Sequence, residues 1–178
     1  RSRQIGCHLA SAQAYREPVL IYMKRSPETL TAFFGVIYAG CYYVPIDEEM
    51  PRRRIELILE NTEAKYLIYD ESTRDKVKDL AFTGTSFSYE ECLSCAPDDK
   101  KLAQIRENSL DEDPIYVLFT SGSTGIPKGV VGHHRGVIDY IESLTEALSF
   151  NEDTIFGNQT PLYLDACLKE IYPTLKYG

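Results

Sequence analysis

The residues best suited to chemistry gather in one stretch, residues 119–129, which reads FTSGSTGIPKG. Its glycines permit positive φ angles and close backbone approach, and its hydroxyl groups and lysine supply donors and one compact cation. Backbone amides, hydroxyls and a cation around a tight turn are suited to holding phosphate oxygens. The candidate phosphate-binding residues are Thr120, Ser121, Gly122, Ser123, Thr124, Gly125 and Lys128. The same composition also fits a flexible surface turn, so residue types alone leave both interpretations open.

Other familiar loop motifs do not fit this stretch. In a Walker A loop the second glycine precedes the lysine, but here Pro127 holds the glycine's place and Gly129, not Ser or Thr, follows Lys128. The dinucleotide pattern G-x-G-x-x-G is absent. Ser123 lacks the glycine two residues before it that a nucleophile elbow requires. These mismatches exclude three common loop chemistries.

The loop follows directly on an unbroken apolar run, residues 115–119, which predicts a buried strand. Similar runs predict strands at residues 18–23, 41–46 and 65–70. Helical periods alternate with these runs, so the sequence predicts an α/β fold with a mostly parallel sheet flanked by helices. Ligands usually bind at the carboxyl ends of the strands in such a sheet, which is where the loop would lie.

Helix signals separate the predicted strands. Ser26 is suited to an N-cap, Pro27 to the first helical position and Gly40 to the end of the same helix. A second helix is predicted to open at Pro51, and its basic run, residues 52–54, is interpreted as a solvated helix start. The other expected elements are a short strand at 86–89, a short helix at 99–105, a four-turn helix at 137–148, a strand at 154–161, and a helix at 165–175 with a kink or early stop at Pro173.

Composition restricts the classes of function. The 178 residues carry a formal net charge of −8, which argues against nucleic-acid and anionic-membrane partners because both need a basic face. No apolar run approaches a membrane span, and the polar opening of the chain does not match a signal peptide. Five irregularly spaced cysteines favour a reducing, cytoplasmic setting. Cys92 and Cys95 form an isolated C-x-x-C, interpreted as two ordinary loop cysteines, and no metal site is predicted.

Three ordered stretches resemble adenylate-forming enzymes. Residues 116–130, YVLFTSGSTGIPKGV, resemble the phosphate-binding signature of that superfamily, which includes acyl-CoA synthetases, luciferases and the adenylation domains of nonribosomal peptide synthetases. Residues 35–47, GVIYAGCYYVPID, and 158–178, NQTPLYLDACLKEIYPTLKYG, are similar to two segments of amino-acid adenylation domains. Together they give a resemblance to an adenylation domain of the nonribosomal peptide synthetase or D-alanine–carrier protein ligase type.

The resemblance implies that residues 1–178 are part of the large N-terminal domain of an adenylate-forming enzyme, truncated at both ends. Such enzymes join a carboxylate to ATP, release pyrophosphate and pass the aminoacyl group to the phosphopantetheine thiol of a carrier protein. An amino acid, ATP and a carrier protein are therefore the expected partners, with the Mg²⁺ ligands expected beyond this chain. The fragment alone is expected to be inactive, and its incomplete sheet is expected to favour self-association.

The resemblance also implies roles for individual residues. Residues 120–125 and Lys128 would hold the β- and γ-phosphates, with Lys128 as a mobile phosphate clamp and no catalytic residue in this chain. Asp165 takes the place of the aspartate that binds the substrate's α-ammonium group, with helix capping as the alternative role. Leu164 and Cys167 depart from the aromatic residue and the serine of that segment, so pocket shape is not carried over.

Several roles stay open at this stage. His133 and His134 are interpreted as helix-start or packing residues, with His134 also considered for the nucleotide site, and Glu170 is interpreted as structural. Two alternative functions remain. One is an acyl- or aryl-CoA ligase, in which Asp165 would meet no ammonium group. The other is a non-catalytic nucleotide-binding or interaction module that keeps the loop only as structure.

Overall fold

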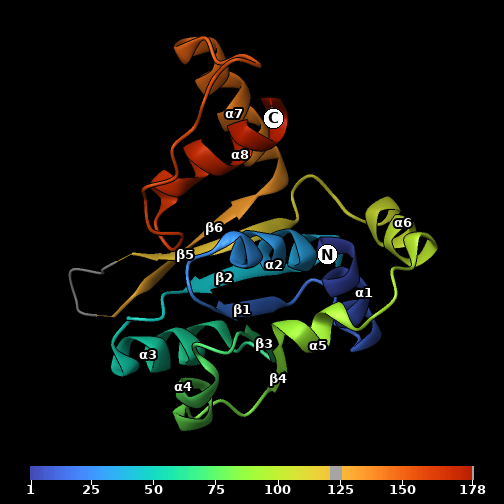
Figure 1. Cartoon of the computed structure of the whole chain (residues 1–178), viewed down its shortest axis with the longest axis vertical. Helices are drawn as coiled ribbons and strands as arrows, with labels where there is room; N and C mark the ends of the chain where they lie inside the picture. The colour runs from blue at the N-terminus through green and yellow to red at the C-terminus, as the bar shows by residue number, and fades with distance from the viewer. Residues whose placement is uncertain (121–125, 178) are drawn as a thin grey trace.

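The computed structural model describes residues 1–120 and 126–177, which contain one six-stranded sheet (Figure 1). The strands are β1 (Pro18–Tyr22), β2 (Tyr42–Ile46), β3 (Tyr66–Tyr69), β4 (Thr85–Ser88), β5 (Pro114–Thr120) and β6 (Lys128–His133). Their order across the sheet is β4-β3-β1-β2-β5-β6. The first five strands run parallel, and β6 pairs antiparallel with β5. The α/β fold with a mostly parallel sheet is therefore confirmed.

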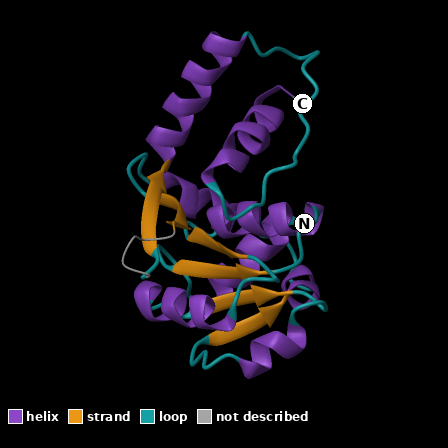
Figure 2. Cartoon of the chain, turned by 90° about the vertical axis from the view of Figure 1, so that its left-hand side faces the viewer, coloured by secondary structure: helices purple, strands orange, loops and turns teal. Residues whose placement is uncertain are grey.

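Helices cover both faces of this sheet (Figure 2). The helices are α1 (Ser2–Ser11), α2 (Pro27–Tyr38), α3 (Arg52–Thr62), α4 (Arg74–Asp79), α5 (Tyr89–Leu93), α6 (Asp99–Glu107), α7 (His134–Leu148) and α8 (Leu168–Tyr177), the last preceded by a 3₁₀ turn, Asp165–Cys167. None of them, in the described ranges, has the length and apolar character needed to cross a bilayer.

The side chains of β1 alternate between two hydrophobic cores, as expected for a strand buried on both faces. Val19 and Ile21 belong to the core that includes residues of α1 and α2, whereas Leu20 and Tyr22 belong to the core that includes residues of α3 and α4. All five β1 residues are buried. This two-sided burial explains why an unbroken apolar run, instead of an alternating one, marks the central strands in the sequence.

The predicted signals around α2 are confirmed. The Ser26 side chain accepts a hydrogen bond from the Thr29 amide at the N-cap, and Pro27 is the first helical residue. Gly40 follows the helix with a φ of +69°, a left-handed conformation that glycine adopts without steric cost. The strands expected at residues 18–23, 41–46, 65–70, 86–89 and 115–119, and the helices expected to open at Pro51 and over 99–105 and 137–148, are all present within two residues at most boundaries.

One expected strand is absent, and one expected helix end lies elsewhere. Residues 154–161 form no strand, and Ile155 is 96% exposed, so this segment has neither a neighbouring strand nor a core to bury it. The helix expected over 165–175 is present as the 3₁₀ turn and α8. The early stop at Pro173 does not occur, because α8 continues to Tyr177, and a kink there stays a prediction. Proline removes a single amide donor, and Pro173 is itself buried in the interior of the helix.

Four elements were not predicted: α1, α4, α5 and β6. Strand β6 matters most, because the glycine-rich stretch leads into an antiparallel strand before helix α7 begins. Its sequence, KGVVGH, is short and contains two glycines, and Val130 and Val131 are more than half exposed. Because of the glycines and the solvent exposure, the sequence of β6 has no apolar run that would have predicted a strand.

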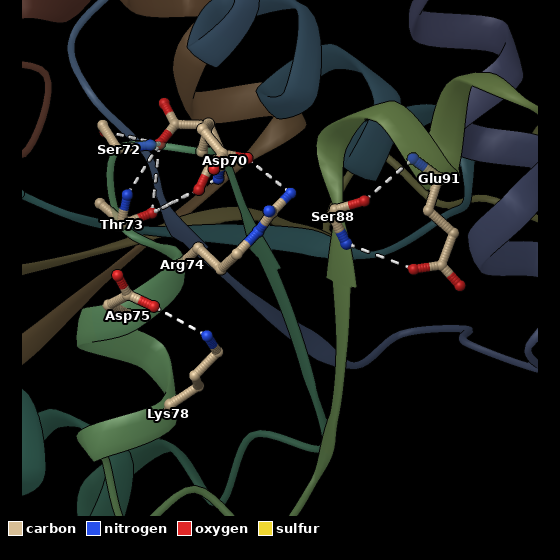
Figure 3. A network of polar contacts seen from close by, with 9 residues as sticks. Asp70, Ser72, Thr73, Arg74, Asp75, Lys78, Ser88 and Glu91 are labelled. Atoms are coloured by element: carbon tan, nitrogen blue, oxygen red, sulfur yellow. Dashed lines mark hydrogen bonds and ion pairs between the residues drawn. The ribbon is translucent and has the colours of Figure 1, made fainter.

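A polar turn follows β3, where Ser72 and Thr73 bond to Asp70 (Figure 3), and it also contacts the carboxyl end of β1. The Asp70 carboxylate accepts hydrogen bonds from the Lys24 amide at 2.9 Å and the Ser72 amide at 3.0 Å. The buried Thr73 hydroxyl donates to the Tyr22 carbonyl oxygen. These bonds satisfy backbone groups at the edge of the sheet where the loops of the candidate site also lie.

Candidate functional site

A groove of about 850 Å³ opens beside β5, between the turn that follows β2 and the segment that contains Asp165. Within the described residues, the ladder between β2 and β5 sets Tyr43 beside Tyr116. The lining residues are Asp47, Glu49, Met50, Pro51, Arg54, Tyr116, Leu118, Phe119, Thr120, Val130, Tyr163, Leu164 and Asp165. The groove therefore lies at the carboxyl end of a parallel sheet, the position predicted for a ligand site.

One wall of the groove is the turn from β2 into α3. Asp47 holds this turn, because its Oδ1 accepts a hydrogen bond from the Glu49 amide at 2.9 Å and its carbonyl accepts one from the Met50 amide at 3.1 Å. An Asp that bonds the amide two residues ahead is a common way to fix such a turn. The turn gives α3 a defined starting point beside the groove.

Two candidate phosphate-binding residues, Thr120 and Lys128, face each other across the β5–β6 pair. The Thr120 hydroxyl donates to the Lys128 carbonyl oxygen at 3.4 Å, and both residues are exposed. Thr120 also lines the groove. The other candidates, Ser121, Gly122, Ser123, Thr124 and Gly125, lie outside the described residues. Thr120 and Lys128 thus flank the predicted loop at its two ends.

Asp165 lies in the same groove, at the start of the 3₁₀ turn before α8. Among the described residues its carboxylate makes no hydrogen bond or ion pair, and the residue is exposed. Its charge acts on two tyrosines. Burial, and secondly the negative charge of Asp165, raise the pKa of Tyr116 and of Tyr140 above the usual value. Asp165 therefore offers a carboxylate to the groove with no partner among the described residues, and a carboxylate there is suited to pair with a cation.

The three arginines that open α3 differ in their environments. Arg52 and Arg53 pair with Glu56 at 2.9 and 3.5 Å on the exposed side, so their solvated role is confirmed. For Arg54 the interpretation as a solvated residue is wrong. Arg54 is half-buried, lines the groove and donates from Nη2 to the Phe119 carbonyl oxygen at 3.2 Å. A signal was present in the sequence, because residue 54 stands four positions before buried Ile58 on the same helix face.

The comparisons with known proteins place the chain in a family. All of it, residues 1–178, matches the profile of the family described as AMP-binding enzyme. The chain belongs to this family. A mycosubtilin synthase protein of Bacillus subtilis is 35% identical over 173 residues, which are 97% of this chain and 6% of that protein. A D-alanine–D-alanyl carrier protein ligase of Staphylococcus aureus is 30% identical over 166 residues, or 93% of this chain and 33% of the ligase.

Solved structures agree with this assignment. The nonribosomal peptide synthetase FmoA3, bound to α-methyl-L-serine-AMP, superposes with a TM-score of 0.83 at 25% identity, over 98% of this chain and 19% of that one. The O-succinylbenzoate coenzyme A synthetase of Bacillus subtilis, in complex with AMP, has a TM-score of 0.82 at 18% identity over 99% of this chain and 45% of that one, which shows a shared fold. The chain spans a third or less of the two curated relatives named above.

Other predicted residues of the chain lie away from the groove. His133 caps α7, because its Nδ1 accepts a hydrogen bond from the Gly136 amide at 3.0 Å, which confirms a helix-start role. His134 does not line the groove but a second one, beside Ile138 and Leu110. The pKa of the His134 imidazole is lowered, and the largest cause is its burial away from water.

The interpretation of Cys92 and Cys95 as two loop cysteines is wrong for Cys92. Cys92 is buried within helix α5 and is not a loop residue, while Cys95 follows the helix and is half-buried. Burial raises the pKa of the Cys92 thiol to about 12. The five cysteines, all within the described ranges, are free thiols.

One set of contacts near the site was not predicted from the sequence. The Arg25 guanidinium donates to the Gln159 carbonyl at 3.0 Å and to the Asn158 side-chain oxygen at 2.9 Å. Glu170, interpreted as structural, accepts hydrogen bonds from Asn158 at 2.7 Å and Thr160 at 3.1 Å. These contacts fix the segment that leads to Asp165. The sequence gives no sign of the Arg25 contacts because they span more than 130 positions of the chain.

Proposed function

We propose that the protein containing this chain is an ATP-dependent, amino-acid-activating ligase, and that residues 1–178 form part of its N-terminal domain. In the first step a carboxylate oxygen of the amino acid attacks the α-phosphorus of ATP. The bond from that phosphorus to the bridging oxygen breaks, and pyrophosphate leaves with the electron pair. In the second step the phosphopantetheine thiol of a carrier protein loses its proton and attacks the acyl carbon. A thioester bond forms, the bond from that carbon to the phosphate oxygen breaks, and AMP leaves.

One observation carries this proposal: Thr120 and Asp165 line the same groove. Thr120 begins the stretch whose amides and hydroxyls are suited to phosphate oxygens, and Asp165 offers a carboxylate to a cation. A substrate that carries an ammonium group and reacts with ATP would meet both. The name of one relative, a D-alanine–D-alanyl carrier protein ligase, points to the same class of substrate.

The proposed roles follow from position and chemistry. Lys128 and the stretch 120–125 would hold the β- and γ-phosphates and so favour departure of pyrophosphate. Asp165 would bind the α-ammonium group and orient the carboxylate toward the α-phosphorus. Metal chemistry is not assigned to this chain: the described residues contain no group of three or more His, Cys, Asp or Glu side chains that could hold an ion. The Mg²⁺ that accompanies ATP is proposed to bind elsewhere in the parent protein.

The carrier protein is the proposed macromolecular partner of the parent protein, as the name of the D-alanine ligase relative suggests. Self-association of this chain is a separate proposal. Val130, Val131 and Ile138 on β6 and α7 are more than half exposed, and β6 is an edge of the described sheet. Sedimentation velocity over a concentration series tests it, and a single monomeric species throughout would reject it.

Amino-acid-dependent exchange of labelled pyrophosphate into ATP by the parent protein tests the proposed function. We expect exchange with at least one amino acid and none with the same compounds lacking the amino group. Asp165→Ala should reduce kcat/KM for the amino acid by roughly tenfold or more, because a charge-assisted contact is lost. Asp153→Ala is the matched control, since Asp153 lies in an exposed turn away from the groove.

Each other outcome decides between alternatives. Exchange with plain carboxylates, unaffected by Asp165→Ala, would replace the proposal with an acyl- or aryl-CoA ligase. Nucleotide binding without any exchange would support a non-catalytic module. The 178-residue chain alone is proposed to give no exchange, and robust exchange by it would reject the view that further parts of the protein complete the site.

A further inference from the structure

Arg54 joins helix α3 to the carboxyl end of β5. Its Nη2 donates to the Phe119 carbonyl oxygen at 3.2 Å, across 65 positions of sequence. Phe119 immediately precedes Thr120, the first residue of the proposed phosphate-binding stretch. The contact therefore lies where β5 ends and that stretch begins.

Few ladder pairs join β5 to its neighbour β2, so the contact from Arg54 adds to what holds this end of β5. Among the described residues, the β2–β5 ladder sets Tyr43 beside Tyr116. On the other side, Phe119 pairs with Gly129 of β6, which is an exposed edge strand. Arg54 thus adds a hydrogen bond from α3 to the backbone at this end of β5.

An arginine at position 54 has local energetic costs, so side-chain packing alone does not explain it. It stands in the first turn of α3, where a positive charge opposes the helix dipole. Its Nε is buried and, within the described residues, has no hydrogen-bond partner. The neighbouring inward positions of the same helix hold apolar side chains, Ile55 and Ile58. An apolar residue at position 54 would pack without these costs but would leave the Phe119 carbonyl without its donor.

Arg52 and Arg53 provide an internal comparison. They belong to the same run, yet their guanidinium groups pair with Glu56, and Arg53 also with Glu60 at 3.8 Å, on the exposed side of α3. Arg54 makes no ion pair with a described residue and turns instead toward the groove. The three arginines therefore differ in the direction of their side chains, although they share residue type and local sequence.

We propose that Arg54 is a positioning residue for nucleotide binding: through the Phe119 carbonyl it fixes the end of β5, and with it the place of Thr120 in the groove. This inference rests on the proposed function, because it assumes that Thr120 meets the phosphates of ATP. Preorganisation of this kind lowers the free-energy cost of assembling the site when the ligand binds. Loss of Arg54 should then weaken ATP binding more than amino-acid binding.

The kinetic test uses the parent protein and pyrophosphate exchange. Arg54→Ala should raise the KM for ATP by roughly tenfold while changing the KM for the amino acid less than twofold. Arg54→Lys, which keeps one donor and the charge, should recover part of the loss. Arg52→Ala and Arg53→Ala are matched controls that should leave both KM values unchanged. Equal increases in both KM values, or the same effect in the control variants, would overturn the proposal.

A second measurement keeps the inference independent of the proposed function. Amide hydrogen exchange in the segment 114–120 of the parent protein should become faster in Arg54→Ala and in the milder Arg54→Lys, but not in Arg53→Ala. If the wild-type protein gives no pyrophosphate exchange, the proposed function fails, and this measurement alone decides whether Arg54 anchors β5. Unchanged exchange in segment 114–120 of both Arg54 variants would reject the anchoring role.

Discussion

Arg25 and Glu170 hold opposite ends of one amide group, that of Asn158. Arg25 Nη2 donates to Asn158 Oδ1 at 2.9 Å, and Asn158 Nδ2 donates to Glu170 Oε2 at 2.7 Å. The arrangement uses both the acceptor and the donor of the amide, and each bond involves a charged partner. It links the segment after β1, the loop before Asp165 and helix α8. The position of Asp165 therefore depends on residues that do not line the groove themselves.

The first prediction concerns this link. Asn158→Asp should disturb the site more than Asn158→Ala, because the new carboxylate would keep the contact with Arg25 but repel Glu170. We expect the KM of the parent protein for the amino acid to rise roughly three- to tenfold in Asn158→Asp, with the KM for ATP little changed. Pyrophosphate exchange measures both values.

Asn151→Ala is the control for this prediction. Asn151 is also a loop asparagine, but it bonds only to its own turn, at Asp153 and Thr154. An Asn151→Ala effect equal to that of the Asn158 variants would indicate a general loop disturbance. So would an increase in the KM for ATP as large as that for the amino acid.

The second prediction concerns the packing of α1 on α2 through Gly35. A Cβ at residue 35 would lie 2.5 Å from the Ile5 Cβ and 2.6 Å from its Cγ2, and Ile5 is fully buried. Alanine gains about 1 kcal/mol of helix propensity over glycine. Overpacking of a tight core contact commonly costs about 1–3 kcal/mol. Because the clash involves a Cβ that cannot swing aside, we expect Gly35→Ala to lower the free energy of unfolding by about 2 kcal/mol.

Gly157→Ala is the matched control, because a Cβ there meets nothing within 4 Å. It should change the free energy of unfolding by no more than about 0.5 kcal/mol. Urea unfolding followed by circular dichroism measures both variants. A Gly35→Ala protein as stable as the wild type would contradict the close α1–α2 contact.

The third prediction concerns thiol reactivity. Cys95 is half-buried, while Cys7, Cys41, Cys92 and Cys167 are buried. Burial raises the pKa of the Cys41 thiol to about 11 and those of Cys92 and Cys167 to about 12, so little thiolate forms near neutral pH. At pH 8 the native chain should show one fast-reacting thiol with a disulfide reagent, and all five after unfolding. Cys95→Ser should remove the fast phase, and survival of that phase would contradict the assignment.

The parts of the fold that the sequence predicted share a physical origin. Central strands such as β1 lie between two helical layers, so every residue is buried and the apolar run is continuous. Helix α2 carries its own start and stop signals in Ser26, Pro27 and Gly40. These features are local, and the sequence contains them in full.

The parts that it did not predict depend on distant partners. Strand β6 is defined by its pairing with β5, not by an apolar run of its own. Arg54 looked like its neighbours Arg52 and Arg53 until β5 was placed beside α3. In the candidate site, Asp165 was found through a resemblance, whereas the contacts of Arg25 and Asn158 arise from segments that meet only after folding.

The last prediction concerns alkaline pH and the buried pair Tyr43 and Tyr172. Their hydroxyl oxygens lie 3.1 Å apart, and the Tyr43 ring stacks on Phe33 with centroids 4.2 Å apart. Burial, the main cause, raises the pKa of both phenols well above the ordinary value of 10.0. The folded chain therefore keeps protons that the unfolded chain releases above about pH 10. This contribution to stability is complete below pH 10 and is lost as the pH rises further.

Tyr43→Phe removes one of the two titrating groups. Above pH 10 its free energy of unfolding should fall less steeply than that of the wild type, by roughly 1.4 kcal/mol per pH unit. Tyr15→Phe is the control for removal of a phenol hydroxyl at a site that is 38% exposed. The buried thiols titrate in the same range but are common to all three proteins, so they cancel in the comparison. Parallel profiles for wild type and Tyr43→Phe between pH 9 and 11 would show that the Tyr43 phenol is not protected by burial.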